Sequence, residues 1–141
     1  MEHGGYAFDM DLITHLTTAD RERLMAEGDV QRLSVGEYLL RRGQRGGDIY
    51  LVESGRLEVV DIGQTPEVIL DVVSEGSLLG EMAFIDQSER VADVRALGES
   101  TVRHWRREAL LRMLEGDPSL RARFYAALTL IAVERLRTTD V

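Results

Sequence analysis

A glycine followed by one acidic and one basic residue carries the clearest chemical signal in this chain. The stretch from Leu79 to Ala92 contains Gly80, Glu81 and Arg90. A helical turn that begins after Gly80 would present backbone N–H groups without partners, and these favour an anion. The Glu81 carboxylate can accept hydrogen bonds from a hydroxyl, and the planar Arg90 guanidinium can pair with phosphate oxygens. This spacing suits a small ligand with a sugar diol and one phosphate.

The motifs around these residues decide how they are interpreted, because two charges alone can equally form a surface ion pair. Three further motifs accompany the Gly80–Ala92 stretch in a fixed order, at Leu33–Gly43, Asp48–Val59 and Trp105–Leu114. With these four motifs the chain resembles the cyclic nucleotide-binding domain family. This family is the regulatory module of the catabolite activator protein, cAMP-dependent protein kinase and cyclic nucleotide-gated channels. The resemblance extends from Leu12 to Thr139.

The resemblance implies a mainly β fold with flanking helices. Its centre is an antiparallel β-roll or jelly-roll barrel, with a short helix in the phosphate-binding cassette. The residue pattern independently favours an antiparallel sandwich or barrel, because short alternating runs are separated by glycines. We expect strands at Val30–Leu33, Tyr38–Leu40, Asp48–Glu53, Arg56–Ile62, Glu67–Val73, Arg90–Ala96 and Thr101–Arg106.

The chain is expected to form a loose tail over residues 1–10 and one domain over 11–141. That domain divides into an N-terminal helical segment (11–28), the β-roll (30–106) and two C-terminal helices (107–141). Thr17 or Thr18 is a suitable N-cap for a helix that ends at Gly28. Asp117 and Pro118 are a suitable cap and first residue for the last helix.

Several ligand contacts follow from the resemblance at the cassette. Gly80 starts the cassette, and Glu81 would bind the ribose 2′-hydroxyl. Backbone N–H groups around Met82 and Ala83 would hold the cyclic phosphate, and Arg90 would neutralise its charge. The implied ligand is cAMP, with cGMP as the second choice, and no further cofactor is expected.

The resemblance also implies contacts beyond the cassette. Val91 would offer a backbone contact, and Val59, Leu70 and Val73 would line the barrel around the base. Such residues fill barrel interiors in any case, so each can equally be plain core. Thr139 falls near the position at which a threonine of the last helix touches adenine in the catabolite activator protein.

The cassette departs from the common family pattern at three positions. Glu89 replaces a frequent proline and brings a negative charge near the expected phosphate. Val91 replaces a small or hydroxyl residue, and the missing hydroxyl favours cAMP over cGMP. Asp93 replaces a common threonine or serine, and strand alternation places it on the face opposite Arg90.

The composition argues against an enzyme and against a nucleic-acid-binding protein. The 141-residue chain contains no cysteine, and all 17 of its basic residues are arginines. Thiolate, Schiff-base and Walker-type P-loop chemistry therefore have no residues to use. His3, His15 and His104 match no metal-binding spacing. A net charge of −8 opposes phosphate-backbone binding, and we find no DNA-binding element.

The partners remain open at this stage. The longest apolar run, Ala126 to Val133, is too short to span a membrane, and we expect a cytoplasmic protein. A helix that is apolar nearly all round is buried on more than one side, either within the fold or against a second copy. Binding would be regulatory, and the chain is either a stand-alone receptor or a sensor for an effector domain outside this sequence. Two alternatives keep the fold: an interaction module with an unoccupied pocket, or a receptor for another effector such as a cyclic dinucleotide.

Overall fold

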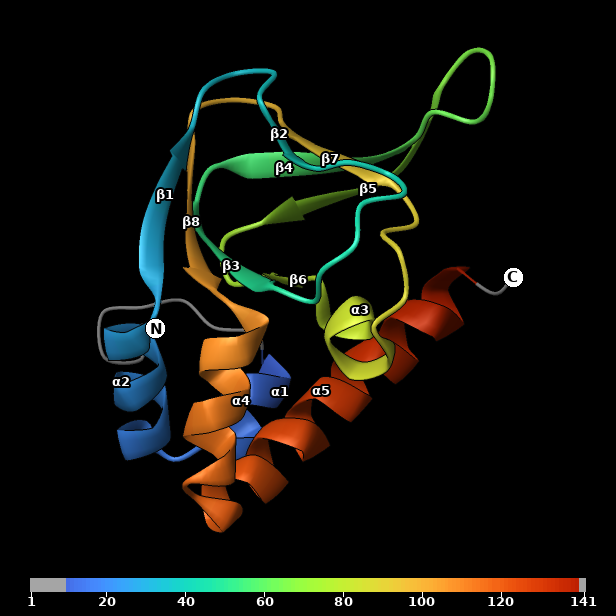
Figure 1. Ribbon diagram of the computed structural model, residues 1–141. Helices are drawn as coiled ribbons and strands as arrows, with labels where there is room; N and C mark the ends of the chain where they lie inside the picture. Colours follow the sequence, from blue (N-terminus) through green and yellow to red (C-terminus); the bar gives the residue numbers. More distant parts are fainter. Residues whose placement is uncertain (1–9, 140–141) are drawn as a thin grey trace.

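Figure 1 shows two facing β-sheets above a group of helices, in a computed structural model that describes residues 10–139. The tail expected over residues 1–10 lies outside the described residues except for Met10, which begins the first helix. The elements in chain order are α1 (Met10–His15), α2 (Thr18–Glu27), β1 (Asp29–Leu33), β2 (Tyr38–Leu40), β3 (Ile49–Ser54), β4 (Arg56–Asp61), β5 (Val68–Ser74), β6 (Leu78–Leu79), α3 (Glu81–Asp86), β7 (Asp93–Ala96), β8 (Ser100–Trp105), α4 (Arg107–Glu115) and α5 (Pro118–Thr139).

The strands form two antiparallel sheets, with the orders β1-β8-β3-β6 and β2-β7-β4-β5. The mainly β roll with flanking helices is therefore confirmed. The sequence pattern did not predict β6, which has two residues and pairs with Tyr50 and Leu51 of β3. Such a short strand has no alternation of its own that a pattern can detect.

The strand expected at Arg90–Ala96 was wrong at its beginning, because β7 starts at Asp93. The backbone of Arg90 instead pairs with the loop between β2 and β3. Its N–H donates to the Gln44 carbonyl at 2.9 Å, and its carbonyl accepts from the Gly43 N–H at 2.9 Å. Arg90 is thus held outside the sheet by two backbone hydrogen bonds.

Helices α2 and α5 begin where the sequence predicted, and their caps explain this. The Thr17 hydroxyl accepts from the Asp20 N–H at 3.0 Å, while the Asp20 carboxylate accepts from the Thr17 N–H at 3.0 Å. This capping box fixes the start of α2. At α5, the Asp117 carboxylate accepts from the Leu120 N–H at 3.1 Å.

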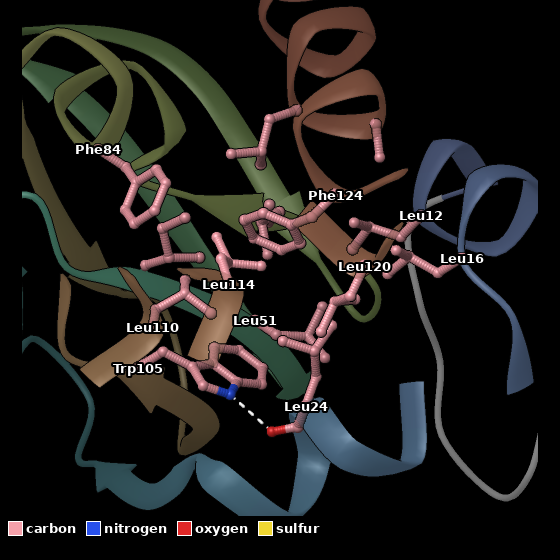
Figure 2. Packing of buried hydrophobic residues seen from close by; sticks show 14 of the residues in the cluster. Leu12, Leu16, Leu24, Leu51, Phe84, Trp105, Leu110, Leu114, Leu120 and Phe124 are labelled. Carbon is pink, nitrogen blue, oxygen red and sulfur yellow. Dashed lines mark hydrogen bonds between the residues drawn. The ribbon is translucent and has the colours of Figure 1, made fainter. Parts of the chain in front are cut away.

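Two hydrophobic clusters connect these layers. One fills the interior of the roll between the sheets and includes Val52, Leu57, Val73 and Val102. The other cluster, part of which Figure 2 shows, joins the β1-β8-β3-β6 sheet to the helices. In it the Trp105 indole N–H donates to the Leu24 carbonyl at 2.6 Å, so the buried ring keeps a partner for its polar atom. The helices are therefore fixed to the roll by a continuous apolar layer.

Candidate functional site

Gly80 determines how the chain enters the cassette helix α3. Its φ of 91° lies in the left-handed region, which favours glycine. A Cβ atom at this position would lie 2.5 Å from the Asp48 carbonyl oxygen and 2.8 Å from Nη1 of Arg90. Only a residue without a side chain lets α3 begin this close to the Arg90 guanidinium.

The Phe84 side chain anchors α3 from below. Its ring is fully buried and lies 6.1 Å from the ring centroids of both Phe124 and Tyr125 on α5. The Arg107 guanidinium donates to the Phe84 carbonyl at 3.1 Å, so α4 is joined to α3 as well. The cassette is therefore positioned by both C-terminal helices.

Among residues 10–139, the buried Arg90 guanidinium has backbone carbonyls and no carboxylate as hydrogen-bond acceptors. Its side chain donates to the Asp48 carbonyl at 2.8 Å and to the Gly80 carbonyl at 3.4 Å, and the residue is 8% exposed. Burial lowers the pKa of Arg90, while Tyr50, Asp48 and Glu81 act in the opposite direction. A guanidinium whose hydrogen-bond acceptors are backbone carbonyls can still pair with an incoming anion through charge-assisted hydrogen bonds.

The loop that holds the Arg90 backbone is itself tied to β7. Asp93 is fully buried, and its carboxylate accepts from the Arg42 N–H at 2.7 Å. The Arg41 guanidinium lies 3.4 Å from the other carboxylate oxygen. The unusual aspartate at this position therefore positions the loop behind Arg90.

Glu81 is also buried, and its partner comes from the far end of the chain. The residue is 2% exposed, and Nη1 of Arg135 lies 2.6 Å and 2.5 Å from its two carboxylate oxygens. Nη2 of Arg135 donates to the Leu78 carbonyl, just before the cassette. Figure 1 shows the last turns of α5 passing beside α3, as this contact requires.

The structure places Glu81 close enough to Arg90 to act on its charge, and Nη1 of Arg90 lies 3.4 Å from the Gly80 carbonyl oxygen. Ala83 is buried, whereas the Met82 side chain is exposed. Glu89, which the sequence placed near the phosphate, is exposed and lies 3.4 Å from the Arg45 guanidinium. Its charge is thus partly compensated outside the cassette.

The residues expected to contact the ligand beyond the cassette lie in different environments. Val73 is buried in the interior cluster, and Val59 packs against it. Leu70 is 51% exposed and Val91 is 80% exposed. Thr139 is the last residue of α5, and its side chain lies outside the part of the chain that the structure describes.

A polar cluster around Asp48 supports the Arg90 guanidinium. The Asp48 carboxylate contacts Nε2 of His104 at 2.7 Å and accepts from the Arg107 N–H at 3.0 Å. The His104 ring stacks on Tyr50 with centroids 4.6 Å apart. Because the Asp48 carbonyl holds Arg90, this cluster fixes the guanidinium, and His104 has a structural role in it.

Sequence reasoning missed Asp48 and Arg135 as site residues. Arg135 had one available signal, since it precedes Thr139 by one helical turn on the segment expected to close over the base. Asp48 acts mainly through its backbone carbonyl, for which no residue type gives a signal. Within residues 10–139, no cluster of histidine and acidic side chains could hold a metal, and no helix has the length and hydropathy to cross a membrane.

Comparison with known proteins gives the family. The profile of the cyclic nucleotide-binding domain matches residues 30–117. The cAMP-dependent protein kinase regulatory subunit of Emericella nidulans is 30% identical over 106 residues, which are 75% of this chain and 25% of that protein. This chain therefore spans about a quarter of the length of that relative.

Two solved structures share the architecture. The N-terminal domain of a transcriptional regulator from Streptomyces coelicolor A3(2) has a TM-score of 0.77 at 26% identity, covering 92% of this chain and 91% of that chain. The catabolite activator protein of Thermus thermophilus also has a TM-score of 0.77, at 25% identity, covering 92% of this chain and 60% of that chain. The chain belongs to the cyclic nucleotide-binding domain family.

Proposed function

We propose that this chain is a non-catalytic sensor module that binds a cyclic nucleotide, with cAMP as the preferred ligand. The observation that carries the proposal is the Arg90 guanidinium, which is buried beside Glu81 with two backbone carbonyls as its hydrogen-bond acceptors. A phosphate at this position would give the cation an anionic hydrogen-bond partner in addition to these carbonyls.

The ligand would be held by groups of both charges. Arg90 would pair with the cyclic phosphate, together with the first N–H groups of α3 at Met82 and Ala83. The Glu81 carboxylate would accept a hydrogen bond from the ribose 2′-hydroxyl. The Val91 side chain carries no hydroxyl for a guanine base, and this supports cAMP over cGMP.

The Arg135–Glu81 ion pair supports a relay to the C-terminal helices. A carboxylate accepts hydrogen bonds at about four positions, and Arg135 already contacts both oxygens of Glu81. A ribose hydroxyl that reaches Glu81 must therefore share the carboxylate with Arg135 or displace it. Displacement would release the end of α5 and change the balance between its arrangements, which is how a ligand shifts a conformational equilibrium.

Calorimetric titration of cAMP and cGMP into the chain tests the proposal directly. We expect saturable binding of both nucleotides, with cAMP bound more tightly. Amide hydrogen exchange of the last turns of α5 should change when cAMP is added, because Arg135 lies in the site. If neither nucleotide binds at millimolar concentration, the proposal is wrong and the unoccupied-pocket alternative is favoured.

Substitution Glu81→Ala should remove the preference for a ribose over a deoxyribose. A hydrogen bond to a charged group contributes about 1.5–3 kcal/mol, so wild type should bind 2′-deoxy-cAMP roughly tenfold to a hundredfold more weakly than cAMP. The Glu81→Ala variant should bind the two nucleotides equally. A preference that persists in the variant would show that Glu81 does not contact the 2′-hydroxyl.

A homodimer through α5 is the second part of the proposal. The buried face of α5 contains Leu120, Phe124 and Ile131, whereas Leu130, Val133 and Leu136 are between 39% and 50% exposed. These three residues follow one another at intervals of three and form a stripe on the helix. Light scattering over a range of concentrations should show a dimer, and Val133→Glu should give a monomer. A wild-type monomer at every concentration would contradict this part.

A further inference from the structure

The loop between β2 and β3 begins with a turn over residues 41–44. The Gln44 N–H donates to the Arg41 carbonyl at 3.2 Å, and the Arg41 N–H donates to the Gln44 side-chain carbonyl at 2.9 Å. This turn carries the two backbone groups that pair with Arg90, the Gly43 N–H and the Gln44 carbonyl. The position of the Arg90 backbone therefore depends on how firmly the turn is held.

Asp93 joins the 41–44 turn to the sheet. It belongs to β7, where it pairs with Val60 of β4, and it is fully buried. Its Oδ1 accepts from the Arg42 N–H at 2.7 Å, a hydrogen bond between positions 51 residues apart. Hydrogen bonds to an ionised acceptor are roughly twice as strong as those between neutral groups. This single contact can therefore hold the turn against β7.

Arg41 supplies the countercharge for Asp93. Its Nε lies 3.4 Å from Oδ2 of Asp93, and Oδ2 accepts no hydrogen bond from residues 10–139. The Arg41 guanidinium also lies over the Tyr38 ring, 3.9 Å from its centroid. A buried carboxylate needs such a cation, because an unpaired charge is costly to bury. The negative charge of Asp93 is thus compensated before a phosphate reaches Arg90.

We propose that Asp93 is a positioning residue for phosphate binding. Its carboxylate holds the 41–44 turn, and the turn holds the Arg90 backbone where the guanidinium can pair with a phosphate. The inference rests on the proposed function and extends it to a residue that acts only through Arg90. Three hydrogen bonds form the connection, with donor–acceptor distances of 2.7, 2.9 and 2.9 Å. Without Asp93, ordering the turn would oppose binding and lower the affinity.

Calorimetric titration of cAMP into Asp93→Ala tests the inference. The variant loses the acceptor for the Arg42 N–H, and we expect roughly tenfold weaker binding than wild type, the lower end of the effect of one charge-assisted hydrogen bond. Asp93→Asn keeps an oxygen for this N–H and should retain most of the affinity. Unchanged affinity in Asp93→Ala would overturn the inference. Tighter binding in both variants would overturn it too, because Asp93 would then act through its charge alone.

Amide hydrogen exchange reports on the 41–44 turn without any nucleotide. The N–H groups of Gly43 and Arg90 form the two hydrogen bonds between the turn and the Arg90 backbone. Both should exchange faster in Asp93→Ala than in wild type, and at the wild-type rate in Asp93→Asn. Wild-type exchange in Asp93→Ala would show that the turn does not need this carboxylate.

Glu58→Ala is the matched control. Glu58 is a buried carboxylate on the same sheet as Asp93, but its partner is Arg95 of β7 and it lies outside the turn. The substitution also removes one buried negative charge. It should leave cAMP affinity and the exchange of the Gly43 and Arg90 N–H groups as in wild type. Equal changes in Glu58→Ala and Asp93→Ala would mean a general loss of stability and would overturn the role of Asp93.

Gln44→Ala perturbs the same turn from its exposed side and keeps the test decisive if Asp93→Ala does not fold. The Gln44 side chain is exposed and accepts from the Arg41 N–H. Its loss should weaken cAMP binding and speed exchange at Gly43. If neither changes, the turn does not position Arg90 and the inference is wrong. Failure of wild type to bind cAMP at all would overturn both this inference and the proposed function.

Discussion

Replacement of Arg90 by alanine is expected to weaken cAMP binding by about 2–5 kcal/mol, or roughly thirty- to several-thousand-fold. The change removes the buried cation that lies between the cassette and Asp48, so the phosphate would be desolvated without a charged partner. Calorimetric titration measures the loss. The variant should remain folded, because the guanidinium itself is costly to bury and its backbone hydrogen bonds to Gly43 and Gln44 do not depend on the side chain.

Arg45→Ala provides the control for the Arg90 prediction. Arg45 lies on the same loop as Gly43 and Gln44, but its side chain is 75% exposed and its partner Glu89 is exposed as well. Loss of one positive charge from the surface should change cAMP affinity little, since exposed ion pairs contribute at most about 1 kcal/mol. Equal losses in the two variants would mean that Arg90 acts through net charge and does not hold the phosphate.

Phe84→Ala is expected to lower the free energy of unfolding by about 3–5 kcal/mol, the usual cost of deleting a buried aromatic ring. Phe84 has no exposed surface and packs on Phe124 and Tyr125, so its loss leaves a cavity between α3 and α5. Urea unfolding without nucleotide measures the effect separately from binding. Because α3 carries Met82 and Ala83, cAMP affinity should fall in the same variant.

Ile85→Ala tests whether the Phe84 effect depends on burial. Ile85 follows Phe84 on the same helix but is 44% exposed. Its replacement should cost well under half as much, because nearly half of the residue is already exposed to water in the folded state. Similar losses for the two variants would show that α3 is held by its own helical stability and not by the ring.

The sequence predicted the architecture well because the roll is built from local signals. The glycines at Gly36, Gly43 and Gly55 all have positive φ angles, and they separate runs with strand-like alternation. The caps at Thr17 and Asp117 form the hydrogen bonds that their residue types favour. These features depend on neighbours three or four residues away, and a sequence pattern contains all the information they need.

The detail of the site depended on contacts that no local pattern contains. Arg90 was assigned to a strand, yet its backbone pairs with Gly43 and Gln44 in a distant loop. Glu81 was expected to face the ligand, and Arg135 contacts its carboxylate. Residue type suggested which groups bind an anion, but tertiary packing determines which of them already have partners.

The bulge at Leu70 shows a further limit of pattern reading. Leu70 and Val73 were both expected to line the barrel, although regular alternation puts residues three apart on opposite faces. The extra residue changes this phase within β5, so Val60 pairs with Ile69 and not with Leu70. A bulge cannot be located from one strand alone, because it is defined by the partner strand.

The contacting groups of the site are far apart in sequence, and this limits what the isolated cassette can do. Asp48 and Arg90 are 42 positions apart, and Glu81 and Arg135 are 54 positions apart. A synthetic peptide that spans only Leu79 to Ala92 would keep the familiar motif but none of these contacts. Anion binding should therefore require the cooperatively folded domain. We expect no binding by the isolated peptide, not merely weaker binding.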